Sequence, residues 1–310
     1  MHDCKQVGKI IVKSRLRTDP RNQEILPEPY EALSYVCMKT VLREYPDGYF
    51  PWHWHDAFEI DYLVNGLVQI HTPEQTERFP QGDVVFINSG IPHEYQAVDD
   101  NPCEIIAFLF DMHFLSGMYN SPLERKYILP IRESSLQIHR VSPNTADRLR
   151  MVSHVLTCME LENEEPFGYE FELRSHLCGF WIGLFQETAG MRTKAHVNSM
   201  DTLRIKKMLN YVHEHCNEKL TASDIAAVAG ISVRECSRCF DRCIGVSPIQ
   251  YLNNYRLHMA AEMLLSTKSS ILEISENCGF NSAAYFSKLF SETMGCTPHQ
   301  YRTGAGQPGK

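Results

Sequence analysis

The strongest constraint on this sequence is an internal repeat in its C-terminal part. Four residues recur 49 positions later, so that Thr221, Asp224, Ile225 and Gly230 are matched by Ser270, Glu273, Ile274 and Gly279. After one inserted residue, six more recur 50 positions later, with Ser237, Arg238, Phe240, Gly245, Pro248 and Tyr251 matched by Ser287, Lys288, Phe290, Gly295, Pro298 and Tyr301. A fixed offset of this kind indicates two copies of one supersecondary unit.

Each copy has the pattern of two helices joined by a tight turn. Thr221 with Asp224, and Ser270 with Glu273, have the spacing of a capping box that begins a short helix, and a glycine ends it. A second helix is predicted over 233–244 in the first copy and over 282–294 in the second. A longer helix over 249–265 joins the copies. We therefore predict two helix-turn-helix units, at 221–244 and 270–294, whose second helices lie in the major groove of DNA.

Several runs in this region carry a family resemblance. They are Thr221–Gly230, Tyr251-Leu252 with Arg256-Leu257, Ala260 and Leu264-Leu265, Cys278-Gly279-Phe280, Tyr285-Phe286-Ser287-Lys288, and Gly295-x-Thr297-Pro298-x-x-Tyr301-Arg302. Over about a third of the chain, they resemble the AraC/XylS family of transcription regulators. The resemblance implies a seven-helix DNA-binding domain, here at 201–302, with both recognition helices on one face of the duplex. It also implies double-stranded DNA and RNA polymerase as partners, and an activator is one expected role.

The exposed positions of the two second helices are the candidate DNA contacts. They are Arg234, Ser237 and Arg238 in the first copy, and Ala283, Ala284, Ser287 and Lys288 in the second. Arginine suits bidentate hydrogen bonding to guanine, whereas alanine can at most touch a thymine methyl group. For any one of these residues, a phosphate contact or plain solvation is an equal alternative.

Three cysteines of the first copy could in principle form a metal-binding or redox site. Cys236, Cys239 and Cys243 follow an i, i+3, i+7 spacing, which places them on one face of the second helix. Free cysteine behaves as a small buried hydrophobe. We therefore expect these three side chains to pack in the core of the DNA-binding domain.

The first 115 residues have the pattern of a small β-barrel. Strands rich in β-branched and aromatic residues are predicted within 33–45, 59–64, 67–71, 84–87 and 104–110, separated by glycine and proline turns. Asn65-Gly66 is a strong two-residue hairpin signal. We predict an antiparallel jelly roll or barrel over 1–115. The whole chain is thus of the α+β multidomain class, with a barrel, a helical segment and an all-α DNA-binding domain.

Two stretches of the barrel resemble the cupin motifs. They are Gly48-x4-His53-x-His55-x3-Glu59-x6-Gly66 and Gly82-x5-Asn88-x-Gly90-x2-His93, with Asn88 where cupins more often have proline. Such a barrel is the usual sensor domain of this regulator family. In metal cupins His53, His55, Glu59 and His93 would be the ligands, a set that suits Fe, Mn, Ni or Zn. Regulators of this type commonly keep such residues without metal, so we expect no metal and no cofactor.

An organic effector is the expected ligand of the barrel. The candidate contacts are His53, His55, Glu59, Tyr62, His93 and Tyr95. Aromatic faces with hydrogen-bonding groups suit a sugar or another small polar molecule, although they suit a plain barrel core almost as well. The alternatives are a metal sensor, a metal-dependent cupin enzyme tethered to DNA, or a regulator that responds to a protein partner. We expect a regulator and not an enzyme, since no phosphate loop or nucleophilic triad stands out.

The segment 116–200 is predicted to be helical and to form a homodimer. Helices are expected over 144–164 and 169–188, and the first carries an apolar stripe of Leu149, Val152, Leu156 and Met159. Leu177, Phe180, Trp181 and Leu184 add apolar surface on the second. One face would cover the barrel or the neighbouring helix, and the rest would form the interface. Residues 190–200 read as a linker, and 303–310 as a disordered tail.

Composition and charge agree with an intracellular DNA-binding protein. No apolar run approaches the ~20 residues needed to span a membrane, the N-terminus lacks a signal-peptide pattern, and 11 scattered cysteines fit a reducing compartment such as the cytoplasm. Residues 201–310 carry 12 basic and 10 acidic side chains, a net charge of +2. Because the whole chain has a net charge of −8, residues 1–200 have a net charge of −10. This asymmetry weakly favours DNA contact at the C-terminal end.

Overall fold

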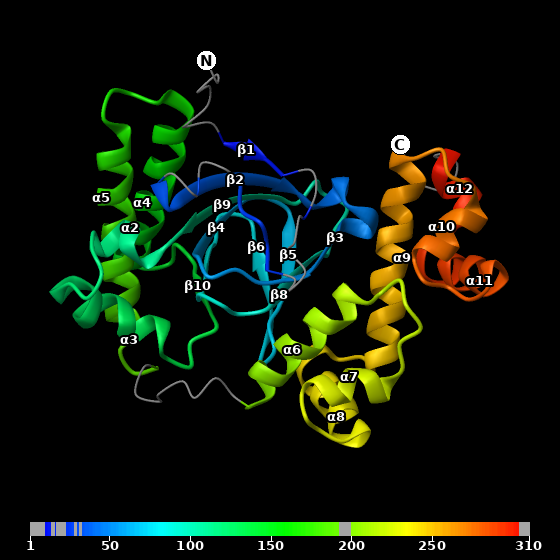
Figure 1. Ribbon diagram of the computed structural model, residues 1–310. Helices are drawn as coiled ribbons and strands as arrows, with labels where there is room; N and C mark the ends of the chain where they lie inside the picture. The colour runs from blue at the N-terminus through cyan, green and yellow to red at the C-terminus, as the bar shows by residue number, and fades with distance from the viewer. Residues whose placement is uncertain are drawn as a thin grey trace, which may run out of the picture. The chain divides into compact units, whose positions relative to one another are not determined.

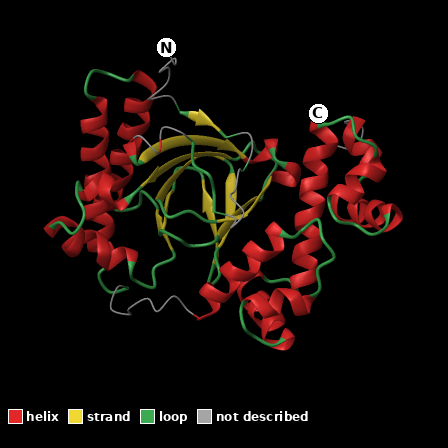
Figure 2. Ribbon diagram, in the orientation of Figure 1, coloured by secondary structure: helices red, strands yellow, loops and turns green. Residues whose placement is uncertain are grey.

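The computed structural model describes residues 10–13, 16, 23–27, 30, 33–191 and 200–303. It divides into two compact units, the first ending at Thr202 and the second beginning at Leu203, and each is described by itself. The first unit contains all the strands of the described chain and the second is helical (Figures 1 and 2). The predicted α+β multidomain class is confirmed.

Two sheets form the barrel of the first unit. The six-stranded sheet has the order β1 (Ile11–Val12), β2 (Tyr35–Val41), β9 (Glu104–Phe110), β4 (Phe58–Asn65), β7 (Val84–Ile87) and β10 (Ile138–Val141). The four-stranded sheet has the order β3 (Tyr49–His53), β8 (His93–Ala97), β5 (Leu67–His71) and β6 (Thr76–Pro80). Neighbouring strands are antiparallel except β1 and β2. The predicted strands are confirmed, while β1, β3, β6, β8 and β10 were not predicted as strands.

The turn at Asn65-Gly66 joins β4 of the six-stranded sheet to β5 of the four-stranded sheet. The predicted turn is present, but the predicted hairpin is wrong, because β4 pairs with β7 and β9 while β5 pairs with β6 and β8. Gly66 has a φ of +91°, and a Cβ at this position would lie 2.8 Å from the Cα of Cys103. Glycine is therefore required here both by the backbone conformation and by the close approach of a neighbouring chain segment.

The two faces of β4 have different neighbours. Phe58 and Ile60 pack in one apolar cluster with the helices, whereas Leu63 packs in a second cluster inside the barrel. Glu59 and Asp61 line the barrel interior. Since successive side chains of a strand point to opposite faces, this alternation places a row of carboxylates inside the barrel and a row of apolar groups outside it.

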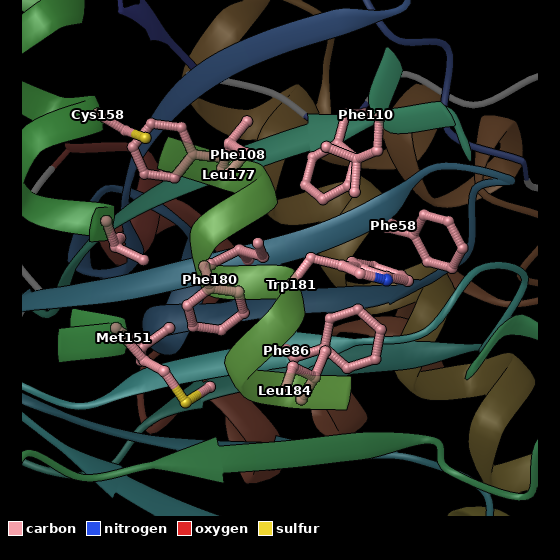
Figure 3. Packing of buried hydrophobic residues seen from close by; sticks show 14 of the residues in the cluster. Phe58, Phe86, Phe108, Phe110, Met151, Cys158, Leu177, Phe180, Trp181 and Leu184 are labelled. Carbon is pink, nitrogen blue, oxygen red and sulfur yellow. The ribbon is translucent and has the colours of Figure 1, made fainter. Parts of the chain in front are cut away.

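Helices α4 (Ala146–Glu164) and α5 (Tyr169–Glu187) cover the outer face of the larger sheet. The Trp181 ring lies 4.8 Å from that of Phe58 and 5.7 Å from that of Phe86 (Figure 3). The two predicted helices are confirmed to within two residues. Between β9 and β10 the chain forms the short helices α2 (Met112–Ser116), η3 (Glu124–Ile128) and α3 (Leu129–Arg132). The barrel sheet therefore continues beyond residue 115, because β10 pairs with β7.

The apolar stripe of α4 is divided between the core and the surface. Val152 is buried and Met159 packs against the core, whereas Leu149 and Leu156 are 54% and 38% exposed. On α5, Leu177, Phe180, Trp181 and Leu184 are all buried. The apolar side chains predicted on α5 thus cover the sheet, and only part of the α4 stripe remains for another contact.

The second unit consists of α6 (Met200–Glu214), α7 (Ala222–Val228), α8 (Val233–Ile244), α9 (Pro248–Ser266), α10 (Ile271–Asn277), α11 (Ala283–Met294) and α12 (Pro298–Thr303). Both predicted capping boxes are present, at Thr221 and at Ser270. The three cysteines of α8 are buried, as predicted.

Two further expectations fall mainly outside the described residues. Most of the predicted linker (192–199) and of the predicted tail (304–310) is not described. Among the described helices, none combines the length and the hydropathy needed to cross a membrane.

Candidate DNA-binding surface and effector site

Helix α8 presents a basic face to solvent. Arg234 and Arg238 are exposed and Ser237 is half-buried, in agreement with their sequence periodicity. Arg242, one turn beyond Arg238, is also exposed, and the i, i+4 spacing could have identified it. Its guanidinium donates a hydrogen bond to the Glu235 carboxylate over 3.0 Å, and Arg238 lies 4.0 Å from the same carboxylate.

Helix α11 presents a much less charged face. Ala284 and Lys288 are exposed, and Ala283 and Ser287 are half-buried. Tyr285 was missed by sequence reasoning, although it is 51% exposed on the same helix. Its hydroxyl oxygen accepts a hydrogen bond from Asn253 of α9 over 3.5 Å. A tyrosine in this place can stack on, or donate a hydrogen bond to, nucleic acid.

A cluster of three histidines and a glutamate lies inside the barrel. The Glu59 Oε2 atom is 3.0 Å from Nε2 of His55 and 3.1 Å from Nε2 of His93. The His53 ring is centred 4.2 Å from the His93 ring. All four side chains are buried. The structure thus brings together the four residues that the cupin-like motifs single out.

Backbone carbonyls determine which ring nitrogen of each histidine carries a proton. The Nδ1 atoms of His53, His55 and His93 lie 2.8–3.0 Å from the carbonyl oxygens of Pro51, Ala57 and Ile91. A carbonyl oxygen can only accept, so each Nδ1 must donate. The Nε2 atoms then point toward one another, and the ligand atoms of the three rings lie within 4.8 Å.

The charges of this cluster follow from its burial and hydrogen bonds. Burial lowers the pKa of His53 well below its usual value, with a further contribution from the neighbouring His93. Burial acts in the same direction on His55, but the hydrogen bond to Glu59 and the charges of Glu59 and Glu24 together outweigh it and raise the pKa of His55. Burial alone would raise the pKa of Glu59, yet the hydrogen bonds with His55 and His93 lower it well below its usual range. We infer an imidazolium–carboxylate pair between His55 and Glu59, beside a neutral His53.

Further polar groups surround a small cavity next to the cluster. The Tyr95 hydroxyl donates to Asp61 over 2.7 Å, and burial, followed by the Glu59 charge, raises the pKa of Asp61. The cavity has a volume of about 10 Å³, enough for about one water molecule. Asp61 was not predicted as a site residue, although it lies two residues from Glu59 and therefore on the same face of β4.

The N-terminal segment contributes an ion pair to the same place. Lys13 binds Glu24, the Lys13 ammonium lies 4.4 Å from the centre of the Phe50 ring, and Glu24 Oε2 is 3.6 Å from Nε2 of His53. Neither Lys13 nor Glu24 stands in any motif, so only the tertiary structure reveals them.

Tyr62 is the one predicted effector contact that the structure does not bring to this group. It packs against the apolar cluster shared with α4 and α5. Because strand residues alternate in direction, Asp61 takes the inward position and Tyr62 the outward one.

The donor set fits a divalent transition-metal ion. Once His55 gives up its Nε2 proton, three Nε2 lone pairs and an adjacent carboxylate suit Zn, Fe, Mn or Ni. A hydrogen bond from Nδ1 to a carbonyl is the usual support of a metal-binding histidine. Two ligand atoms that are each ~2.1 Å from one ion lie at most ~4.2 Å apart. The observed limit of 4.8 Å therefore requires a contraction of several tenths of an ångström.

Comparison with known proteins assigns both units. A family model for an AraC-like ligand binding domain matches residues 40–180, and a model for a helix-turn-helix domain matches residues 225–304. The chain is similar to YdeC, an HTH-type transcriptional regulator of Bacillus subtilis, with 28% identity over 92% of this chain and 97% of that protein. It is 24% identical to the melibiose operon regulatory protein of Escherichia coli (strain K12), over 81% and 82% of the two chains.

Among solved structures, ToxT from Vibrio cholerae aligns over 87% of this chain and 98% of its own, with a TM-score of 0.45 and 14% identity. The two family models match the same two units that the repeat and the cupin-like motifs delimit. The chain therefore belongs to the AraC family of DNA-binding transcription regulators, with an N-terminal ligand-binding domain.

Proposed function

We propose that this regulator responds to a small polar organic molecule bound inside the barrel, with His53, His55, Glu59, His93 and Tyr95 as contacts and Asp61 added to them. One observation carries the proposal. Two buried carboxylate oxygens, namely Glu24 Oε2 and Asp61 Oδ1, lack a hydrogen-bond partner among the described residues. An unsatisfied buried polar group costs about 1–3 kcal/mol, so a ligand that pairs with these atoms is stabilised by them.

The small cavity limits how such a molecule enters. A space for about one water molecule means that a larger effector has to displace side chains, and the Lys13–Glu24 pair lies at this place. Sugars are the first class to test, because they offer many hydroxyl donors to carboxylate oxygens. The name of one relative refers to the melibiose operon.

The test is thermal unfolding of the full chain with a panel of sugars and other polar metabolites. Residues 1–115 alone would lack α5 and β10 and would expose the sheet that Trp181 covers. A ligand at 100 times its Kd stabilises the folded state by about 2.7 kcal/mol, which raises Tm by several degrees. His93→Ala and Asp61→Asn should abolish the shift, whereas Tyr62→Phe, outside the barrel, should keep it. An equal loss in all three variants would contradict an interior site.

A metal-ion sensor is a second candidate, favoured by the three histidines whose Nε2 atoms converge. Metal analysis of protein purified without chelator decides it. Stoichiometric Zn, Fe, Mn or Ni, lost in His55→Ala and retained in Tyr95→Phe, would support metal binding. Wild-type protein that takes up none of these ions on dialysis would exclude the candidate and leave the organic effector. On either reading the chain acts through DNA binding in the cytoplasm and not through turnover.

Dimerisation through α4 and α5 is the proposed mode of assembly. Leu149, Leu156, Phe171 and Ile182 are large apolar side chains of these helices that remain exposed. Because α5 also covers the sheet, deleting the helices would unfold the barrel, and point variants are the better test. Sedimentation of full-length Leu156→Asp/Ile182→Asp should give a monomer, while Met118→Asp, outside the pair, should leave the dimer. A dimer that survives the double substitution would place the interface elsewhere.

RNA polymerase is the proposed partner once the protein is bound at its site. In vitro transcription with purified polymerase tests this directly. A change in transcript level that needs both the regulator and its DNA site supports the partnership, and its direction distinguishes an activator from a repressor.

A further inference from the structure

Three exposed arginines form a ridge along α8, the helix labelled in Figure 1. Arg234, Arg238 and Arg242 follow one another at intervals of four residues, about 6 Å along the helix axis. The opposite face carries Cys236, Cys239 and Cys243, which are buried. The arginine ridge, defined by these three residues, is therefore the part of α8 that faces away from its own domain.

Glu235 binds two members of the arginine ridge with one carboxylate. Its Oε1 accepts a hydrogen bond from the Arg242 guanidinium over 3.0 Å, and its Oε2 lies 4.0 Å from the Arg238 guanidinium. The Glu235 backbone N–H donates to the Ser232 hydroxyl over 3.2 Å, which anchors this residue in the first turn of α8. The carboxylate is thus held beside two of the three cations that α8 offers to DNA.

The arrangement contributes little to folding. The side chains of Arg238 and Arg242 are 56% and 48% exposed, and exposed ion pairs on a helix are worth little for stability. A carboxylate in the first turn also favours the helix without any arginine partner. We therefore expect the pairing to affect DNA binding more than the stability of the fold.

Two effects on DNA binding follow from the pairing. An arginine that is already paired with a carboxylate gains less binding free energy from a phosphate. Each phosphate contact adds ~0.9 to the magnitude of the slope of log K against log salt concentration. A guanidinium held by a carboxylate also keeps a defined plane, and bidentate recognition of guanine requires that plane to be aligned with the base edge. The first effect weakens binding to every sequence, and the second favours one sequence.

We propose that Glu235 is a specificity-determining residue of the first helix-turn-helix unit. It withholds Arg238 and Arg242 from indiscriminate phosphate contact and orients Arg242, whose guanidinium it holds by a hydrogen bond, toward a base edge. This inference rests on the DNA-facing role of α8. Helix α11 provides the contrast, because its Lys288 lies 3.8 Å from Glu292, and a lysine ammonium has no plane to orient.

The experiment compares Glu235→Gln with two variants of equal charge change. Asp241→Asn alters an exposed carboxylate on the same side of α8 that has no ion pair with the arginine ridge among the described residues. Glu292→Gln alters the partner of Lys288 on α11. Each full-length protein is titrated with the DNA site that the wild type selects from random sequence, and with random DNA of equal length, over a range of salt concentrations.

Glu235→Gln should bind random DNA roughly three to ten times more tightly, with a salt slope larger by about one. Its preference for the selected site should fall at least about threefold. Glu292→Gln and Asp241→Asn should change both affinities alike and leave the preference unchanged.

Three results would overturn the inference. The preference could stay unchanged in Glu235→Gln, or it could fall equally in Asp241→Asn. Affinity for the selected site alone could drop, which would make Glu235 itself a base contact, for instance to cytosine N4. In an Arg242→Ala background the effect of Glu235→Gln on preference should largely vanish. If Arg238→Ala changed neither affinity, the DNA-facing role of α8 would itself have failed, and that outcome is distinct from the others.

Discussion

The two helix-turn-helix units have the same local design and different surroundings. Helices α8 and α11 have 12 residues each, follow a serine N-cap and end at a glycine with positive φ. Their exposed faces differ, because α8 carries the arginine ridge and α11 carries Ala284, Tyr285 and Lys288. Their turns differ as well, because the turn of the second unit lies against the backbone at Cys216 and Asn217. The two copies of the motif thus share their backbone geometry, but they differ in exposed side chains and in the contacts of their turns.

The largest expected difference concerns the two turn glycines. A Cβ on Gly279 would lie 2.8 Å from the Cα of Asn217 and closer still to the Cys216 carbonyl oxygen, whereas a Cβ on Gly230 would meet nothing within 4 Å. Both have positive φ, which costs alanine about 1–2 kcal/mol. Gly230→Ala should therefore lose about 1 kcal/mol, and Gly279→Ala more than about 3 kcal/mol. Chemical denaturation measures both, and equal losses would show that the second turn can shift away from α6.

The next effect concerns base recognition by α8. Arg238→Ala should cost about 1–3 kcal/mol at the selected site and relax the preference at one base pair. Ala283 and Ala284 cannot replace such hydrogen bonds, so the half of the site that faces α11 should contain less sequence information. Selection from random DNA with wild type and variant measures this. Equal information in the two halves would be evidence against the division of labour.

Acid should destabilise the first helix-turn-helix unit before the second. His213 of α6 stacks on Tyr255 of α9 and shares a 2.6 Å hydrogen bond with Tyr251, and burial lowers its pKa to about 3. A base whose folded pKa lies below its unfolded pKa of ~6.5 contributes stability above pH 6.5, which is lost as the pH falls toward the folded pKa. At pH 5 the loss should be about 1–2 kcal/mol.

Hydrogen exchange of the full chain at pH 7 and pH 5 tests this expectation. Amides of α6 and α8 should lose protection before those of α10 and α11, because His213 lies on α6 and contacts Tyr251 and Tyr255 of α9. His258 of α9, whose pKa burial lowers to about 4, acts in the same direction. His213→Gln should reduce the difference between the two pH values, and an unchanged difference would assign it to other groups.

The smallest effect is expected at Lys288 of α11. This side chain is 73% exposed and suits a phosphate contact more than base recognition. Lys288→Ala should weaken binding to all sequences alike and lower the salt slope by about one. Titrations at several salt concentrations measure both quantities, and a sequence-dependent loss would mean that Lys288 reads a base.

The sequence by itself determined the features that depend on neighbouring residues. The capping boxes at Thr221 and Ser270, the limits of α8 and the Asn65-Gly66 turn are encoded within a few residues, because hydrogen bonds at helix ends and tight turns are local. That the turn leads into the other sheet, and not into a hairpin, was not encoded there. The burial of Cys236, Cys239 and Cys243 followed from helical periodicity, and the grouping of His53, His55, Glu59 and His93 from the spacing of the cupin-like motifs.

Only the tertiary structure decided which distant segments meet. Glu24 reaches His53 across 29 positions, and Trp181 covers Phe58 across more than 120. Neither contact has a local signal, since it depends on how the sheet closes and on which helix covers it. The same closure turned Asp61 inward and Tyr62 outward. In the second unit, the packing of helices placed Gly279 against Cys216 and Asn217, just after α6. The hydrophobic periodicity of a strand or helix can be read from its own sequence. Which element packs against each of its faces depends on the packing of the whole unit.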